Sequence, residues 1–77
     1  MLNENIKKIL EDKIPDSTVL VDGDGSKYTV RIISDIFSGK SKVERHKIIY
    51  SYLNNYISSG EIHALTIESF TKDEAAK

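Results

Sequence analysis

The spacing between two β-branched segments strongly limits how this chain can fold. The segments Tyr28–Ile33 and Ile62–Ser69 both have strand-like patterns, and about 28 residues that include one long helical segment separate them. A connection of this length with a helix in it is long enough for a right-handed crossover, which places the two strands in parallel. We therefore expect them to lie parallel in one sheet.

A first helix and a hairpin are predicted before this unit. Asn3 or Asn5 can cap the helix, and Pro15 prevents its continuation beyond about Lys13. Its apolar residues recur at helical spacing and are Leu2, Ile6, Ile9 and Leu10. The β-branched segment Ser17–Asp22 should then pair with Tyr28–Ile33, with the sequence Asp22-Gly-Asp-Gly-Ser as the turn between them.

The long helix has a recognisable start and end. Ser41 is the predicted N-cap because Glu44 follows it at the spacing of a capping box, and Gly60 should end the helix after about Ser58. The predicted apolar stripe contains Val43, Ile49, Tyr50, Leu53, Tyr56 and Ile57. His46 falls inside this stripe, which indicates a hydrogen-bonded histidine at the edge of the core. A short helical turn is expected at 34–37.

The last strand alternates in a way typical of burial on one face only. Leu65 and Ile67 share one side, whereas Ala64, Thr66 and Glu68 share the other. The predicted fold class is α+β, a three-stranded mixed sheet with its helices on one face. The opposite face, which includes Arg31, Thr66 and Glu68, should be open to solvent. The polar residues 71–77 are predicted to form a frayed tail.

Composition excludes several classes of protein. A chain of 77 residues forms one domain with one core, and the net charge of −1 argues against a strongly basic nucleic-acid binder. The absence of cysteine excludes disulfides and thiolate metal sites. The N-terminal residues contain no apolar signal-peptide core, and no segment approaches the roughly 20 apolar residues of a membrane span. We expect a cytoplasmic protein without a membrane partner.

Two groups of residues are candidates for function. The helix that starts after Gly39 collects the positive charges of Lys40, Lys42, Arg45 and Lys47 near its N-terminus, where backbone amides favour phosphate. Gly39-Lys-Ser-Lys also retains one glycine of the Gly-x-x-Gly clamp of KH nucleic-acid domains. A solvated helix face is the structural alternative for this run.

His63 is the second candidate. It stands at the first turn of the last strand with the parity of Leu65 and Ile67, where a core-facing position can still be reached from solvent. A structural role is the default for a lone histidine. No arrangement of nucleophile and base can be argued from this order of residues, so the sequence gives no case for an enzyme.

Four segments together resemble the BolA family, and more closely its IbaG-like branch, over about residues 1–71. They are Gly23-Asp-Gly-Ser26, Phe37-x-Gly-Lys-Ser41 leading to Arg45-His46, the pair Ile49-Tyr50, and Ile62-His-Ala-Leu65. The resemblance implies a fold similar to a class II KH domain, of order α-β-β-α-α-β. Residues 1–71 would form this domain, and 72–77 a polar tail.

The resemblance also implies a function. BolA proteins partner monothiol glutaredoxins, with which they share a [2Fe-2S] cluster, and act in iron–sulfur cluster handling or iron regulation. Some members are described as transcriptional regulators linked to stress and cell shape. The family's C-terminal histidine ligand falls on His63. A chain without cysteine cannot complete the ligand set of such a cluster, so a partner, with glutathione, has to supply the sulfur ligands.

Two positions depart from the family pattern. The family's second ligand, a histidine or cysteine after Gly-Asp-Gly-Ser, falls on Lys27, and a protonated ammonium offers no lone pair to iron. Where the family commonly has Thr-Pro-x-Glu-Trp, this chain has Thr71-Lys-Asp-Glu-Ala75 and loses an apolar anchor.

The leading hypothesis is therefore a non-enzymatic adaptor, a monomer or weak homodimer, that contributes His63 to a cluster shared with a monothiol glutaredoxin. The isolated chain should hold no cofactor. The alternative is a transcriptional regulator that binds DNA or RNA weakly through Gly39, Lys40, Lys42, Arg45 and Lys47.

Overall fold

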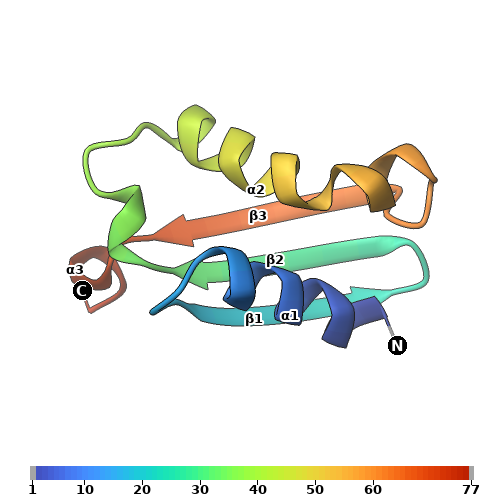
Figure 1. Ribbon diagram of the computed structural model, residues 1–77, viewed down its shortest axis with the longest axis horizontal. Coiled ribbons are helices and arrows are strands. Elements are labelled where there is room, and N and C mark those ends of the chain that lie inside the picture. The colour runs from blue at the N-terminus through green and yellow to red at the C-terminus, as the bar shows by residue number, and fades with distance from the viewer. Residues whose placement is uncertain (1, 77) are drawn as a thin grey trace.

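The computed structural model describes residues 2–76, which form an α+β domain (Figure 1). The predicted domain start at Met1 and the predicted tail end at Lys77 lie outside the described residues. The elements in chain order are α1 (Leu2–Lys13), β1 (Thr18–Asp24), β2 (Lys27–Ile33), the 3-10 helix η1 (Asp35–Phe37), α2 (Lys42–Ser58), β3 (Ala64–Phe70) and α3 (Lys72–Ala75).

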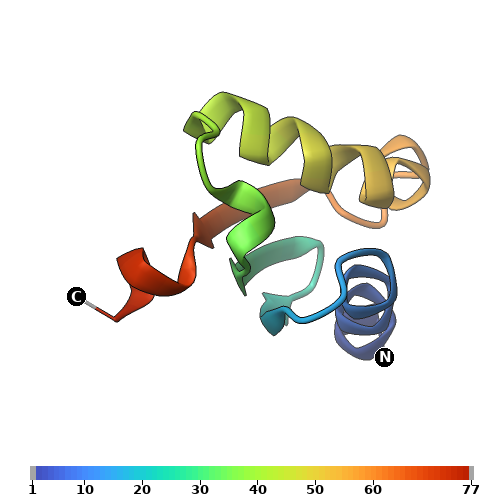
Figure 2. The same ribbon diagram turned by 60° about the vertical axis from the view of Figure 1, so that its left-hand side comes forward.

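The three strands form one mixed sheet in the order β1-β2-β3. β1 and β2 are antiparallel, with Val21 opposite Val30. β2 and β3 are parallel, with Val30 beside Ile67, so the predicted parallel pairing across the long connection is confirmed. Figures 1 and 2 show α1 and α2 on the same side of the sheet, α1 over β1 and α2 over β3.

The first helix has the predicted end but not the predicted cap. It ends at Lys13, and Ile6 and Leu10 are buried as expected. Asn3 and Asn5 lie inside the helix rather than before it, because the helix already begins at Leu2. Neither asparagine can therefore be the N-cap, which has non-helical backbone angles.

The hairpin is longer and tighter than the predicted one. β1 continues through Asp24 and pairs with Lys27, which leaves Gly25 and Ser26 as the connection. Gly25 has φ +65° at the first central position, as a type II′ turn requires. Gly23 lies within the strand opposite Tyr28, and a Cβ at this position would overlap the Tyr28 ring. The aromatic ring thus occupies the space that a side chain would need.

The start of α2 agrees with the prediction. Ser41 accepts a hydrogen bond from the Glu44 amide (3.2 Å), and the Glu44 carboxylate accepts one from the Ser41 amide (3.0 Å). Gly60, with φ +84°, follows the helix end, and η1 confirms the predicted turn after Ser34. The predicted stripe is wrong at Val43 and Tyr50, which are exposed (63% and 41%), and it omits Arg45, which is buried.

The core lies between the helices and the inner face of the sheet. Ile6, Leu10, Val30, Ile49 and Leu53 are completely buried there. Arg31 and Glu68 lie on the outer face and pair at 3.1 Å, so the predicted open face is confirmed. The start of β3 was predicted too early, because Ile62 is a buried loop residue and the strand begins at Ala64.

Residues 71–76 of the predicted frayed tail form a docked helical turn and its caps instead. Thr71 caps α3, and its hydroxyl and the Glu74 carboxylate form a capping box. Glu74 also bonds to Arg45, and Lys72 pairs with Asp16 at 2.9 Å. Within residues 2–76, no helix has both the length and the apolar character to cross a membrane.

Candidate functional site

His63 is exposed at the end of the sheet where the hairpin turn lies. It immediately precedes β3, and its backbone amide donates a hydrogen bond to the Ser26 carbonyl (2.8 Å). The Ala64 amide donates to the same carbonyl (3.2 Å). The sequence pattern placed His63 on the core-facing side, but the buried neighbour Ile62 takes that role, and the imidazole is left on the surface.

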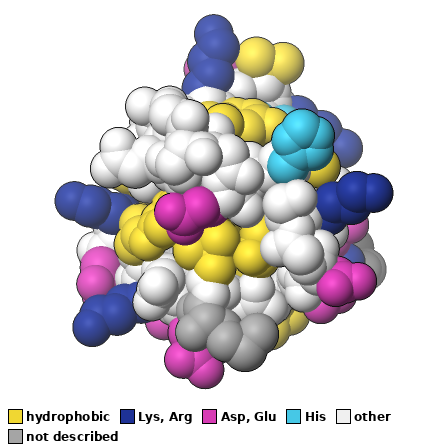
Figure 3. All heavy atoms as spheres, turned by 90° about the vertical axis from the view of Figure 1, so that its right-hand side faces the viewer, with side chains coloured by type: hydrophobic (Ala, Val, Ile, Leu, Met, Phe, Trp, Pro, Cys, Tyr) yellow, Lys and Arg dark blue, Asp and Glu magenta, His cyan; other side chains and the backbone are white. Residues whose placement is uncertain are grey.

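Lys27 lies beside His63, although 36 positions separate them in the sequence. The parallel register pairs Lys27 with Ala64, and Ser26 precedes Lys27 just as His63 precedes Ala64. Figure 3 views this end of the molecule, where a histidine ring stands at the surface next to lysine or arginine side chains. The fold thus brings together the two positions onto which the family ligand pattern maps.

This end of the molecule offers one imidazole and no complete metal site. Among residues 2–76 there is no group of three histidine, cysteine or acidic side chains that could hold a metal ion. A [2Fe-2S] cluster takes four protein ligands, of which two can be imidazoles. The donor set therefore fits one ligand of a shared cluster and does not fit a cluster held by this chain alone.

The basic segment at the start of α2 is only partly exposed. Lys42 and Lys47 are at the surface, whereas Arg45 is 7% exposed. The Arg45 guanidinium donates to the carbonyls of Lys40 (3.0 Å) and Ser69 (3.2 Å) and to both carboxylate oxygens of Glu74 (2.7 and 3.2 Å). Its expected place on an exposed basic face is therefore wrong, because these internal acceptors hold the guanidinium inside the domain.

Arg45 also determines the protonation of its partner. Hydrogen bonds from Arg45 and from the Thr71 amide lower the pKa of Glu74 to about 2. The guanidinium lies 5.9 Å from the centre of the Phe37 ring, within the range of a cation–π contact. One buried cation thus connects α2, β3, α3 and the ring of η1.

The Gly39 loop uses much of its own hydrogen-bonding capacity. The Lys40 ammonium donates to the Ile36 carbonyl (3.0 Å), and the amides of Ser38, Lys40 and Ser41 all donate within the chain. Gly39 itself has φ +76°, a conformation that favours glycine. The loop is therefore held by internal bonds, and Lys42 and Lys47 are the exposed cations of the predicted nucleic-acid residues.

His46 has a different environment from the predicted one. It is half-buried and lines a hollow with Lys42, Ile67 and Phe70. Among residues 2–76 its ring takes part in no hydrogen bond, so the predicted hydrogen-bonded core role is not what the structure has. The helix is rotated relative to the expected stripe, and Arg45 takes the inward position next to it.

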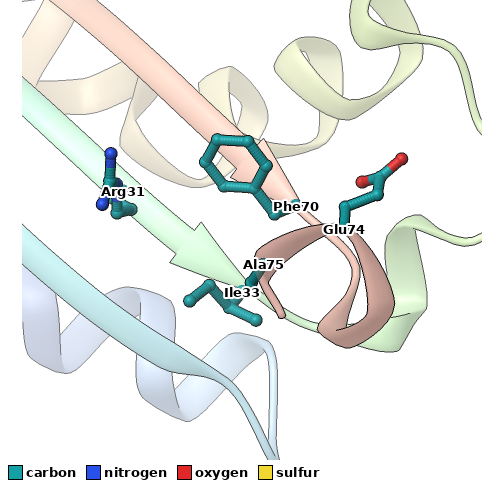
Figure 4. Close-up of a pocket in the computed structure, with 5 residues that line it drawn as sticks. All are labelled: Arg31, Ile33, Phe70, Glu74 and Ala75. Carbon is teal, nitrogen blue, oxygen red and sulfur yellow. The ribbon is translucent and has the colours of Figure 1, made fainter. Parts of the chain in front are cut away.

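A further hollow of about 240 Å³ lies on the open face, between the ends of β2 and β3 and α3 (Figure 4). Arg31 and Phe70 line it, with the Arg31 guanidinium carbon 5.6 Å from the ring centre. Figure 4 shows Ala75 beside Ile33 and Glu74 directed away from Arg31. The small side chain of Ala75, at the position where the resemblance implies a tryptophan, borders this space.

The sequence did not indicate the roles of Glu74 in α3 and of Ser69 near the end of β3. The partnership of Arg45 and Glu74 spans 29 positions, and no local pattern indicates it. Ser69 is buried, and its hydroxyl oxygen has no hydrogen-bond partner within the described chain. Its core-facing parity with Leu65 and Ile67 was the available signal for its burial.

Comparison with known proteins agrees with the fold and with the sequence pattern. Residues 4–74 match the model of the BolA-like protein family. A protein of Acinetobacter guillouiae called "Uncharacterized protein in rpoN-murA intergenic region" is 43% identical over all of this chain and 93% of its own length. "Acid stress protein IbaG" of Escherichia coli K12 is 34% identical over all of this chain and 92% of its own length.

Solved structures show the same fold. The BolA domain of SufE1 from Arabidopsis thaliana superposes with a TM-score of 0.86 at 32% identity, covering 95% of this chain and 94% of that one. BolA1 from the same plant has a TM-score of 0.83 at 25% identity, covering 94% and 93% of the two chains. The chain described here belongs to the BolA family.

Proposed function

We propose that this chain is a non-enzymatic adaptor that binds a monothiol glutaredoxin and contributes His63 to a shared [2Fe-2S] cluster. Membership of the BolA family supports the adaptor function, and the exposed position of His63 supports its role as the cluster ligand. Within residues 2–76, this histidine is fixed through its backbone at a sheet end and has no structural partner for its ring. The imidazole is therefore free to bind a group brought by another protein.

The chemistry requires a partner. With no cysteine, the chain offers no thiolate, so the sulfur ligands come from the glutaredoxin and glutathione. The cluster, when bound, would combine thiolate and imidazole ligands, and this exchange changes its potential and lability. The role of this chain is to present one imidazole at an accessible edge. The rigid strand and the Ser26 carbonyl fix the backbone that carries it.

The decisive experiment compares the two histidines. A cluster-loaded monothiol glutaredoxin is mixed with the wild-type chain, with His63→Ala or with His46→Ala, and visible absorption and circular dichroism are recorded. The wild type and His46→Ala should change the spectrum, and His63→Ala should not. Because His63 is exposed, its removal should alter the free energy of unfolding by less than about 0.5 kcal/mol. A wild-type heterocomplex spectrum from folded His63→Ala would refute the ligand assignment.

The nucleic-acid alternative keeps one specific observation in its favour, the exposure of Lys42 and Lys47 on α2. Two phosphate contacts would give a slope of log affinity against log salt of about −1.8 on duplex DNA. We therefore expect weak binding that Lys42→Glu and Lys47→Glu abolish. Arg45→Ala is an unsuitable probe, since it disrupts the buried network. Tight sequence-specific binding at 0.2 M salt (a chosen test condition,) would make this function the leading one.

A further inference from the structure

The outer edge of β3 carries backbone groups without a strand partner. Among residues 2–76, β3 is a terminal strand of the sheet and pairs only with β2. The Phe70 carbonyl accepts a bond from Ser34, which directly follows β2, whereas the Ser69 carbonyl accepts one from Arg45 on the other side. Because alternate residues of a strand direct their N–H and C=O to the same side, the groups of Leu65 and Ile67 face outward with those of Ser69.

Two adjoining hollows follow this edge beneath the first turns of α2. They have volumes of about 260 and 250 Å³, and both are lined by Lys42, Ser69 and Phe70. The first also contacts His46, Ile67 and Glu68, and the second contacts Arg45 and Glu74. We call this continuous surface the β3 groove. Its walls are an unpaired strand edge and a helix.

The charges of the β3 groove leave one cation available. Glu68 is paired with Arg31, and Glu74 is paired with Arg45. Lys42 is exposed, and none of the ion pairs among residues 2–76 involves it. The groove therefore combines free backbone groups, the apolar surface of Ile67 and Phe70 and one free positive charge.

We propose that the β3 groove binds an extended segment of a partner protein that adds to β3 as a fourth strand and places a carboxylate against Lys42. The main-chain hydrogen bonds of an added strand supply the affinity, and the α2 side chains that line the groove select among the side chains of the peptide. Arg45 already occupies the Ser69 carbonyl, so the added segment ends there. The unpaired N–H and C=O groups of Leu65 and Ile67 match the main chain of an extended peptide, which argues for a peptide rather than a nucleic acid.

This site is separate from the proposed cluster ligand. The groove lies along Ile67–Phe70, whereas His63 precedes the first residue of β3 at the other end of the strand. Four to seven residues of strand at about 3.3 Å each place roughly 13–23 Å between them. The β3 groove can therefore bind its segment whether or not His63 is a ligand.

The test uses two strand-forming probes that differ only in charge. The ¹⁵N-labelled full chain is titrated with acetyl-Thr-Val-Glu-Val-Thr-amide and with the same peptide carrying Gln in place of Glu. We expect the Glu peptide to shift the amide resonances of Leu65, Ile67 and Ser69 and to slow their hydrogen exchange. The Gln peptide and a backbone N-methylated Glu peptide should bind at least about fivefold more weakly, since each loses one kind of contact.

Protein variants complete the design. Lys42→Glu should weaken binding of the Glu peptide, whereas Lys47→Glu, an equally exposed change outside the groove, should not. His63→Ala should leave peptide binding unchanged. The proposal is overturned if the Glu peptide leaves the three edge amides unmoved, or if the Gln peptide binds equally well. It is also overturned if a dT8 oligonucleotide shifts the same amides at lower concentration than the peptide does. A shift of these amides when the chain is diluted without peptide would overturn it too, because it would show that a second copy of the chain binds the edge.

Discussion

At the scale of single residues, Gly23 is required by a neighbour rather than by its own backbone. It lies in β1 opposite Tyr28, whose ring fills the space of a Cβ. The ring is itself buried in the core cluster and cannot move freely. The glycine of the Gly-Asp-Gly-Ser segment therefore has a packing reason, whereas Gly25 has a conformational one, with φ +65° in the turn.

We expect Gly23→Ala to lower the free energy of unfolding by about 1–3 kcal/mol through overpacking against Tyr28. Gly25→Ala meets no atom within 4 Å and should cost only about 1 kcal/mol, for its left-handed backbone. Urea unfolding of both variants and of the pair Gly23→Ala with Tyr28→Leu separates the two causes. If the penalty of Gly23→Ala is the same in the Tyr28→Leu background as beside the native tyrosine, the ring is not responsible.

Some side chains could not be placed from the sequence because their partners lie far from them along the chain. The burial of Arg45 depends on acceptors in β3 and α3, and a charged residue at a core position breaks the apolar pattern of its helix. Val43, which the predicted stripe includes, is exposed. For His63, its place next to the turn follows from the parallel register, but its exposure depends on Ile62 becoming the buried residue.

At the scale of elements, local signals sufficed where they act within a few residues. The capping box of Ser41 and Glu44 and the glycine after the helix marked both ends of α2. The turn was placed too widely because Asp22 and Asp24 favour turns locally, yet cross-strand pairing extends the ladder to Asp24. The docking of α3 could not be anticipated, since the arginine that binds its carboxylate lies in another element.

The N-cap of α2 gives an element-scale prediction. Ser41→Ala removes the acceptor of the Glu44 amide and should lower the free energy of unfolding by about 1 kcal/mol. Ser58→Ala, an exposed change at the other end of the helix, should have little effect or a slightly stabilising one. Chemical denaturation of the two variants measures the difference. Equal stabilities would mean that the capping box contributes nothing.

The docking of α3 should depend on pH. The pKa of Glu74 is lowered to about 2, so the folded state holds its carboxylate ionised more strongly than the unfolded chain does. Its contribution is therefore fully present above the ordinary pKa of a glutamate and is lost as the pH falls from about 5 towards 2. Hydrogen exchange of the α3 amides across this range should show weaker protection at low pH.

Glu74→Gln is the matched variant for this titration. Glutamine keeps the shape of the side chain and removes the group that titrates, so the fall in α3 protection between about pH 5 and pH 2 (the range set by the lowered pKa) should be reduced. Near neutral pH its α3 should be less protected than in the wild type, because Arg45 keeps its two carbonyl acceptors but loses the charge partner. An unchanged pH profile would show that Glu74 does not control the docking.

At the scale of the whole molecule, the parallel pairing of β2 with β3 organises both proposed sites. It places Lys27 beside Ala64, and so beside His63, at one end. At the other end the same strand forms the β3 groove with α2. Neither site has a complete set of ligands or a closed cavity. One offers an imidazole without the other ligands of a cluster, and the other offers a strand edge without a neighbouring strand. This arrangement is what an adaptor requires, since each partner supplies what the surface lacks.

The last prediction concerns Lys27 in the complex with a cluster-loaded glutaredoxin. An imidazole at this position, next to His63 across the parallel register, would offer a second nitrogen ligand where the native ammonium offers none. We expect Lys27→His to slow cluster loss from the heterocomplex and to shift its visible circular dichroism. Asp24→His is the matched control, because it adds the same side chain to the hairpin on the strand away from β3. If Lys27→His and Asp24→His release the cluster to an apo-acceptor at the wild-type rate with an unchanged spectrum, the hairpin takes no part in coordination.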